Sequence, residues 1–312
     1  MFASELRLIG NHPKFLKAVE FADNVSVTKS PVLVVGESGS GKRTICQYIH
    51  RKSSRASSDL LVVDCAQDAQ AVENEILGHR DEEGKFNKGI LERANGGSVI
   101  LENIDAIDEG FQKRLYQILL ELSDYDLDVR VMATTTKNLS KYVGAGRFYR
   151  ALFTYFSGSQ ISLVPLRERG ADIETLAAHF ATEVATEAGR GEISFTEEAK
   201  RKIGSFYWAH NVAELKSVIE STVANSEGSE IDVSAIEIGE KKAETVTNEI
   251  DDDGLRLMSL KEAERLLIKK ALIHTSENRT QAAKILGVSI RTLRNKINEY
   301  RSDGNNYFVN LR

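Results

Sequence analysis

The chain has 312 residues, of which 41% are hydrophobic and 28% charged, with a formal net charge of -5. This length allows about two domains, and the composition is typical of a soluble globular protein. No apolar run approaches the ~18 residues of a membrane-spanning helix, and no charged-then-apolar leader opens the sequence. We therefore expect a cytoplasmic protein without a membrane partner. The only cysteines, Cys46 and Cys65, lack metal-binding spacing and are expected to be buried, reduced thiols.

The charges are distributed unevenly along the chain. Residues 255–312 hold 12 Lys and Arg against 5 Asp and Glu, a net charge of +7. The remaining residues hold 29 and 41, a net charge of -12. A basic C-terminal module on an acidic body indicates that the module binds a polyanion. Charge alone is equally consistent with a basic face that is exposed to solvent.

The first informative pattern is a glycine-rich loop between a strand and a helix. Residues 32–35 form an apolar run typical of a buried strand, residues 44–50 have a helical pattern, and the residues between them fit G-x-x-x-x-G-K. In such a loop, backbone N–H groups and the helix N-terminus bind phosphate oxygens, and the lysine adds a mobile positive charge. A glycine-rich turn without a ligand is the alternative.

This loop predicts ATP or ADP as a ligand. The expected contacts are Gly36, Glu37, Ser38, Gly39, Ser40, Gly41, Lys42, Arg43 and Thr44. One position departs from the general pattern, because Arg43 stands where a Ser or Thr would hold magnesium, and Thr44 is one place late.

Four further apolar runs are predicted strands, at residues 60–63, 98–101, 129–133 and 160–164, and helical patterns such as 111–122 separate most of them. Strands that alternate with helices indicate an α/β fold with a mainly parallel sheet. Helical patterns without strands follow at 172–186, 196–204 and 212–225, and Thr196 is placed to cap the second of these helices. We expect a nucleotide-binding α/β core at 1–168 and a helical lid subdomain at 169–225.

An acidic stretch follows at residues 226–254, with ten acidic and two basic residues. That charge density disfavours a packed core, so the stretch is predicted to be a linker. An amphipathic helical pattern at 260–275 then opens a C-terminal module, expected at 255–312.

The C-terminal module contains two short helical patterns joined by a glycine turn. Thr280 is expected to cap the first helix and Ser289 the second, and Gly287 suits the left-handed turn between them. Leu293 and Ile297 lie four residues apart, which predicts an inward face for the second helix. Small residues at 282 and 283 suit a close helix crossing.

Basic and polar side chains occupy the other faces of the second helix. Arg and Asn can bind guanine and adenine edges, while Lys and Thr suit phosphates. We therefore expect double-stranded DNA as a partner. Arg291, Arg294 and Asn295 are the expected base contacts, and Ser289, Thr292 and Lys296, together with Thr280 and Gln281, are the expected backbone contacts. A protein-binding helical hairpin is the alternative.

These residues resemble the Fis-type helix-turn-helix, and the body resembles the AAA+ domain of the bacterial enhancer-binding proteins, the NtrC-like activators of sigma-54 RNA polymerase. The matching landmarks are residues 36–42, 63–66, 75–79, 94–98, 164–169 with 172–173, and 211–212 with 214–215. The resemblance covers almost the whole chain. It implies a P-loop AAA+ core with a parallel sheet and a helical lid, followed by an all-α helix-turn-helix domain. The family's N-terminal sensory domain is expected to be absent.

Several positions depart from the family's pattern. The G-A-F-T-G-A loop, which contacts the sigma factor in the family, is replaced by the charged segment 80–88. The family's second catalytic signature ends in Asp-Glu, where this chain has Glu102 and Asn103. Glu102 remains a candidate magnesium ligand, but an amide at 103 cannot accept the proton of an attacking water.

The positions of the family's other catalytic groups are also changed. Tyr149 and Tyr155 align with the arginine fingers, Thr136 with the sensor asparagine and Ala213 with the lid arginine. Arg147 or Arg150 takes over a finger role if the alignment slips by a residue or two. Together, these losses favour weak or absent ATP hydrolysis.

Three functions follow as hypotheses. The first is a sequence-specific transcription regulator that binds ATP or ADP, hydrolyses it poorly and does not engage sigma-54, with Mg2+ left open as a cofactor. The second is a working sigma-54-dependent activator with ATPase activity, and the third is a modulator of a related AAA+ activator that does not bind DNA. Fis-type modules usually pair, so a homodimer through the C-terminal domain is expected. A higher oligomer, and contact with RNA polymerase or a related regulator, are left open.

Overall fold

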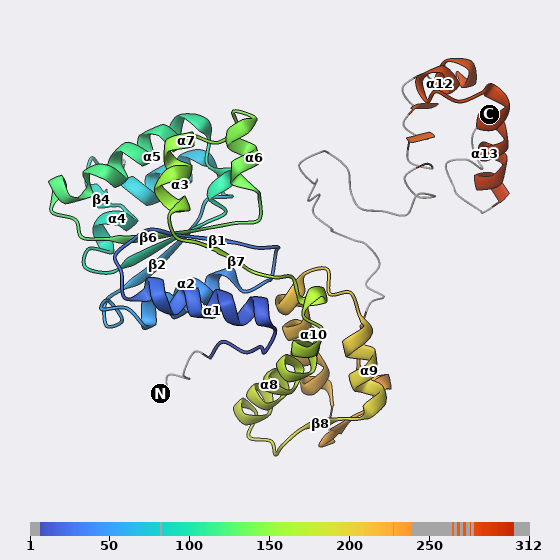
Figure 1. Cartoon of the computed structure of the whole chain (residues 1–312), viewed down its shortest axis with the longest axis horizontal. Helices are drawn as coiled ribbons and strands as arrows, with labels where there is room; N and C mark the ends of the chain where they lie inside the picture. The colour runs from blue at the N-terminus through green and yellow to red at the C-terminus, as the bar shows by residue number, and fades with distance from the viewer. Residues whose placement is uncertain are drawn as a thin grey trace. The chain divides into compact units, whose positions relative to one another are not determined.

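The computed structural model describes residues 7–81, 83–226 and 228–238, and, nearer the C-terminus, residues 264, 267, 268, 271, 272, 275 and 278–302. The chain divides into two compact units, Met1–Lys241 and Lys242–Arg312. The first unit holds an α/β core and a helical lid, which Figure 1 shows from blue to orange along the chain. Among the described residues, no helix has both the length and the apolar character needed to cross a membrane.

A five-stranded parallel sheet forms the centre of the core. Its strand order is β2-β5-β6-β1-β7. The strands are β1 (Val32–Val35), β2 (Leu60–Asp64), β5 (Ser98–Glu102), β6 (Arg130–Thr135) and β7 (Gln160–Ser162). Side chains alternate between the two faces, so that Val32 and Val34 pack into one hydrophobic layer and Leu33 into the other.

Helices cover both faces of this sheet. Helices α1 (Pro13–Ser26) and α2 (Lys42–Arg51) pack on one face. The other face is covered by α3 (Ala69–Leu77), α4 (Ile90–Arg93), α5 (Glu109–Glu121), α6 (Leu139–Gly144) and α7 (Arg150–Ser157), with turns η1 (Ile104–Ala106) and η2 (Leu122–Tyr125). This arrangement confirms the predicted α/β fold, since a parallel sheet needs both faces buried.

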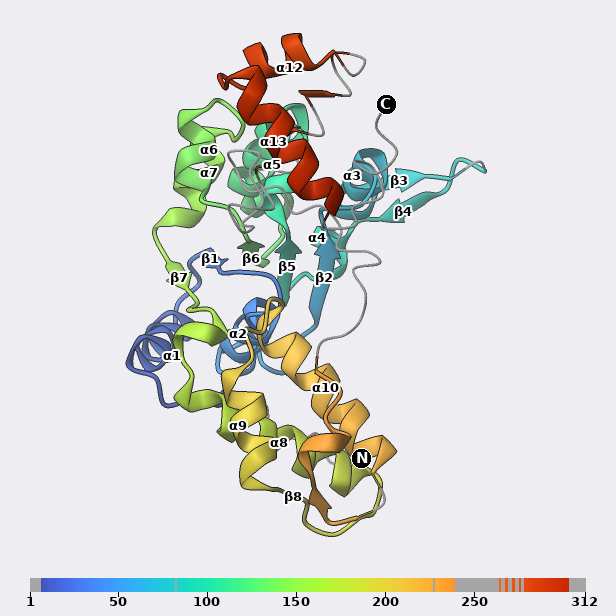
Figure 2. The same cartoon turned by 90° about the vertical axis from the view of Figure 1, so that its right-hand side faces the viewer.

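A two-stranded antiparallel hairpin projects from the core, as Figure 2 shows. It consists of β3 (Gly78–Arg80) and β4 (Phe86–Lys88). The Asp81 carboxylate accepts the Lys85 N–H at 2.9 Å, and Gly84 takes a φ of +82° in the turn. The charged segment 80–88 therefore forms a short hairpin.

The lid is built from α8 (Ala171–Glu187), α9 (Glu197–Ser205) and α10 (Asn211–Asn225). A short parallel pair, β8 (Ser194–Phe195) with β9 (Glu230–Ile231), and the turns η3 (Leu166–Glu168) and η4 (Val233–Ala235) complete it. Thr196 caps α9 as predicted, because its hydroxyl accepts the Ala199 N–H at 3.2 Å. The fully buried Trp208 donates from its indole nitrogen to the Ile203 carbonyl at 3.0 Å.

The prediction that residues 226–254 lack a packed core is wrong for residues 228–238. Ile231 and Ile236 are each 1% exposed and pack among the lid helices. The Lys202 ammonium donates to the Ile236 carbonyl at 2.7 Å. The prediction was based on the average charge of the stretch. That average does not show that exposed acidic residues alternate here with buried isoleucines. Residues 239–254 lie outside the described part of the chain.

In the C-terminal unit, α12 (Arg279–Ile285) and α13 (Ile290–Ser302) form a helix-turn-helix around a small core. Gly287 has the predicted left-handed conformation, with a φ of +67°. The first cap was wrongly assigned to Thr280. Asn278 is the N-cap, and its side chain accepts the N–H groups of Thr280 and Gln281. The predicted helix at 260–275 lies mostly outside the described residues, although positions 264, 267, 268, 271 and 272 are helical.

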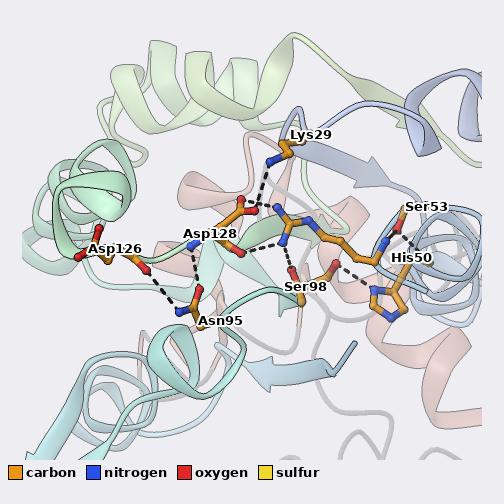
Figure 3. A network of polar contacts seen from close by, with 9 residues as sticks. Lys29, His50, Ser53, Asn95, Ser98, Asp126 and Asp128 are labelled. Atoms are coloured by element: carbon orange, nitrogen blue, oxygen red, sulfur yellow. Dashed lines mark hydrogen bonds and ion pairs between the residues drawn. The ribbon is translucent and has the colours of Figure 1, made fainter. Parts of the chain in front are cut away.

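A polar network lies at the amino ends of β5 and β6 (Figure 3). Its centre is Arg55, which is 6% exposed, donates to the Asp128 carbonyl at 2.7 Å and pairs with the Asp128 carboxylate. The buried His50 ring joins the same network, with Nδ1 2.9 Å from the Ser98 hydroxyl and Nε2 3.1 Å from the Ser58 carbonyl. Burial lowers the pKa of His50 below its usual range.

This imidazole is expected to make the free energy of unfolding of the core depend on pH. Because its folded-state pKa lies below the unfolded value near 6.5, the unfolded chain binds the proton more readily as pH falls. We expect the free energy of unfolding to decrease as pH drops below about 6.5, by at most about 1.4 kcal/mol per pH unit. Urea unfolding of the wild type and His50→Gln, from pH 8 to pH 5, checks this. Equal pH slopes in the two proteins would contradict it.

Candidate nucleotide and DNA sites

The glycine-rich loop joins the carboxyl end of β1 to the amino end of α2. Gly39 and Gly41 have φ angles of +69° and +98°, a region that strains any residue with a side chain. Because α2 begins at Lys42, the N–H groups of its first turn face the loop. The Ser40 hydroxyl is buried and has no hydrogen-bond partner. A phosphate oxygen would satisfy these groups, so the residues present fit a nucleotide phosphate.

The loop opens onto a cleft of about 780 Å³ that core and lid residues line together. This volume is in the usual range for small-molecule sites. Lys42 folds over the loop and donates from Nζ to the carbonyls of Gly36 and Glu37, at 2.9 Å each. Of the predicted nucleotide contacts, Ser38, Gly39, Ser40, Gly41, Lys42, Arg43, Thr44 and Glu102 line the cleft, while Gly36 and Glu37 are not among its lining residues.

The structure ties the Glu37 side chain to the lid. Its carboxylate accepts two hydrogen bonds from the Arg167 guanidinium, at 2.6 Å each, and one from the Asn211 amide at 3.2 Å. The bonded guanidinium lowers the pKa of Glu37 below its ordinary value. Sequence inspection missed this contact, because the partners lie 130 and 174 residues from Glu37.

Asn211 is the central residue of this connection. It is fully buried, takes a φ of +54°, accepts the Leu166 N–H at 2.7 Å and donates to the Ser38 carbonyl at 2.9 Å. The next contact along α10 runs from the Ala213 N–H to the Gly39 carbonyl, at 3.1 Å. We call the contacts of Glu37, Arg167 and Asn211 the loop–lid clasp.

The predicted magnesium ligand, Glu102, is paired with an arginine. The Arg43 guanidinium donates from Nε to Oε1 at 2.8 Å and from Nη2 to Oε2. This hydrogen-bonded carboxylate raises the pKa of Arg43. Beside it, Asn103 takes a left-handed conformation, with a φ of 53°, and donates its amide to Asp64 Oδ1 at 2.8 Å.

Both cysteines are buried and free, as predicted. Burial raises the pKa of Cys46 to about 12 and also raises that of Cys65. A thiol that stays protonated is a poor nucleophile, so neither residue is a candidate for covalent chemistry.

The helix-turn-helix presents most of the predicted DNA contacts to solvent. Leu293 and Ile297 face inward as predicted, at 0% and 2% exposed. The exposed members of the set are Thr280, Gln281, Ser289, Arg291, Thr292, Arg294 and Asn295. Lys296 is half-buried, and its ammonium lies 3.0 Å from the Glu264 carboxylate.

The second helix of this module, α13, has a serine N-cap and a buried tyrosine near its end. The Ser289 hydroxyl accepts the Thr292 N–H at 3.0 Å, which confirms the predicted cap of α13. Tyr300, which the sequence pattern did not single out, is 1% exposed and donates its hydroxyl to Glu264 at 2.9 Å.

Three family models match the chain in succession. The sigma-54 interaction domain matches residues 8–162, the AAA+ ATPase lid domain residues 167–251, and the bacterial regulatory protein, Fis family, residues 259–300. The matches follow the order of core, lid and helix-turn-helix along the chain.

Whole-chain relatives agree with these matches. The transcriptional regulatory protein FlbD of Caulobacter vibrioides is 32% identical, over 96% of this chain and 71% of its own length. The regulatory protein AtoC of Escherichia coli is 30% identical, over 95% and 68%. The nitrogen fixation protein VnfA of Azotobacter vinelandii is 31% identical over 96% of this chain, which spans 60% of that protein.

Solved structures carry the same fold. NtrX from Brucella abortus in complex with ADP superposes with a TM-score of 0.66 at 21% identity, over 95% of this chain and 69% of that one. At this identity the likeness shows the fold alone. Together, the family models and the whole-chain relatives establish that the chain belongs to the family of bacterial transcriptional regulators that combine a sigma-54 interaction domain, an AAA+ lid and a DNA-binding Fis-type helix-turn-helix.

Proposed function

We propose that this chain is a sequence-specific DNA-binding regulator whose AAA+ unit binds ATP or ADP, hydrolyses it poorly and does not engage sigma-54. The observation that carries the proposal is the amide at position 103. Asn103 donates to Asp64 at the carboxyl end of the sheet, beside the loop, and an amide cannot take a proton from water. Losing a general base typically lowers a rate by ~10²–10⁴.

A tyrosine cluster supports the same conclusion. Tyr149 and Tyr155, which align with the family's arginine fingers, both pack edge-on against Tyr116, with ring centroids 5.8 and 6.5 Å apart. Neutral phenols cannot supply the charge that an arginine finger brings to phosphoryl transfer. The Arg147 guanidinium lies over the Tyr142 ring, 5.9 Å from its centroid.

The β3–β4 hairpin supports the proposed loss of sigma-54 contact. Its turn is closed by the Asp81 carboxylate, and the segment from 80 to 88 is charged and short, with Phe86 as its only large apolar residue. The apolar, threonine-bearing tip of the family's G-A-F-T-G-A loop has no counterpart in this segment. Mapping of bound genomic sites should therefore show no enrichment at sigma-54 promoters.

Phosphate release measured beside nucleotide binding tests the proposal. The full chain should bind ADP and a non-hydrolysable ATP analogue, and release phosphate from ATP no faster than a Lys42→Ala variant. That variant should bind nucleotide roughly 10- to 100-fold more weakly, since it loses a charged hydrogen-bond donor. Robust turnover that Lys42→Ala abolishes would contradict poor hydrolysis and favour a working ATPase.

Substitution of Arg294 tests whether the second helix recognises a specific DNA sequence. It is exposed on α13, and if it binds a guanine edge, Arg294→Ala should cost about 1–3 kcal/mol at one base pair of the target site. Fluorescence anisotropy at fixed salt, on the target and its single-base variants, measures this. Lys284→Ala, which removes an exposed cation of α12, is the control and should lower affinity equally for all sequences. Uniform weakening by Arg294→Ala would make it a phosphate contact instead.

The proposed organisation has a nucleotide-binding core to residue 168, a lid, an acidic linker and a helix-turn-helix module at 255–312. Leu166, Ile231 and Ile236 pack with the lid helices, and this packing supports extending the proposed lid to residues 166–238. The C-terminal module is proposed to pair with a second copy, and Leu267, 55% exposed on a helical segment, suits such a face. Failure of the module to bind any promoter at low salt would favour a non-DNA-binding modulator.

A further inference from the structure

The residues beside the phosphate loop do not fit a resident Mg2+. This ion is held by carboxylate, hydroxyl and phosphate oxygens together with water. Position 43 carries a guanidinium in place of a hydroxyl, and both oxygens of Glu102 are bonded to that guanidinium.

We infer that the Arg43 guanidinium takes the place of the divalent cation, so that the phosphates of a nucleotide are bound by Lys42 and Arg43 without magnesium. This inference rests on the proposed binding of ATP or ADP, and it deepens that proposal by naming how the phosphate charge is neutralised. Glu102 is then a positioning residue that orients the guanidinium.

The geometry of the pair leaves Arg43 able to donate to a second anion. A guanidinium carries five N–H groups in a fixed fork, and the bonds to Glu102 use one on Nε and one on Nη2. Three N–H groups remain for phosphate oxygens, for which the fork is well suited. The Arg43 side chain is 55% exposed and lines the same cleft as Lys42, Ser40 and Gly41.

The position of Arg43 on its helix also indicates an anionic ligand. Lys42 and Arg43 are the first two residues of α2, whose first turn contains no acidic residue. The amino end of a helix already carries a partial positive charge, so two cations there are unfavourable unless an anion offsets them. Glu102 offsets one charge, and the phosphates would offset the rest.

Calorimetric titration of the full chain with ADP, in millimolar Mg2+ and in excess EDTA, tests the inference. The wild type should show dissociation constants within about threefold of each other in the two buffers. Arg43→Ser should bind roughly 10- to 100-fold more weakly in EDTA, and Mg2+ should restore part of the loss, because a hydroxyl then stands where the general loop pattern has one. Arg43→Lys keeps the positive charge but loses the forked N–H donors. Its dissociation constant for ADP in EDTA should lie between those of the wild type and Arg43→Ser.

Arg201→Ser is the matched control, since it removes an exposed arginine of α9 that does not line the cleft. It should bind ADP like the wild type in both buffers. Wild-type binding that requires Mg2+ would overturn the inference while leaving nucleotide binding in place. Equal affinity of the wild type and Arg43→Ser in EDTA would also overturn it. No ADP binding in either buffer would overturn the inference and the proposed nucleotide binding together.

Discussion

Trp208→Ala should lower the free energy of unfolding by about 3–5 kcal/mol, the range found when a large aromatic side chain is removed from a core. Trp208 is fully buried in the lid and packs edge-on against Phe206, with ring centroids 4.9 Å apart. Its indole N–H is also bonded, so the variant leaves both a cavity and the Ile203 carbonyl without its donor. The lid should therefore be the first part of the AAA+ unit to unfold in this variant.

The neighbouring Tyr207 provides a matched control for this experiment. It is 57% exposed and its ring lies 5.3 Å from the Arg167 guanidinium, so Tyr207→Ala should cost less than about 1 kcal/mol. Trp208 is the only tryptophan of the chain, which means that urea unfolding must be followed by far-UV circular dichroism rather than by fluorescence. Similar midpoints for the two variants would contradict the packing role of Trp208.

Asn211→Ala should destabilise the AAA+ unit by about 2–4 kcal/mol and loosen the lid from the phosphate loop. The change removes three hydrogen bonds and leaves the Leu166 N–H buried without its 2.7 Å acceptor. Each buried donor or acceptor left unsatisfied costs about 1–3 kcal/mol. Alanine also tolerates the left-handed conformation of this position less well than asparagine does.

Hydrogen exchange gives this second prediction a local readout. The Leu166 amide should exchange much faster in Asn211→Ala, because its only bond in the clasp is gone. Asn225→Ala is the control, since it changes the same residue type at the exposed far end of α10. Unchanged protection at Leu166 would show that the clasp is not what holds the lid.

Much of the fold could be predicted from the sequence, because the signals were local. The apolar run at 32–35 and the glycines after it specify a strand and a phosphate loop within about ten residues, and the structure has β1 at Val32–Val35. The turn glycine and the serine cap of the helix-turn-helix are equally local, and both predictions were confirmed at Gly287 and Ser289.

The parts that could not be predicted depend on distant partners. The pairing of Arg43 with Glu102 joins residues 59 positions apart, and the clasp joins Glu37 to Asn211 over 174 positions. From one sequence alone, a charged or polar residue that pairs with a distant partner cannot be distinguished from one that is exposed to solvent. The magnesium role of Glu102 was predicted from the resemblance to the family's second catalytic signature, and that resemblance gave no sign of the ion pair between Glu102 and Arg43.

Gly39 shows what the close approach of the lid means for the sequence of this loop. A side chain at this position would clash with the His210 carbonyl of the lid, whereas Gly41 has open space around it and is constrained by its backbone angle alone. Packing of the lid against the loop therefore requires a glycine at position 39, whether or not the protein hydrolyses ATP. A protein that has lost ATP hydrolysis would still need this glycine, so the glycine alone is no evidence that ATP is hydrolysed.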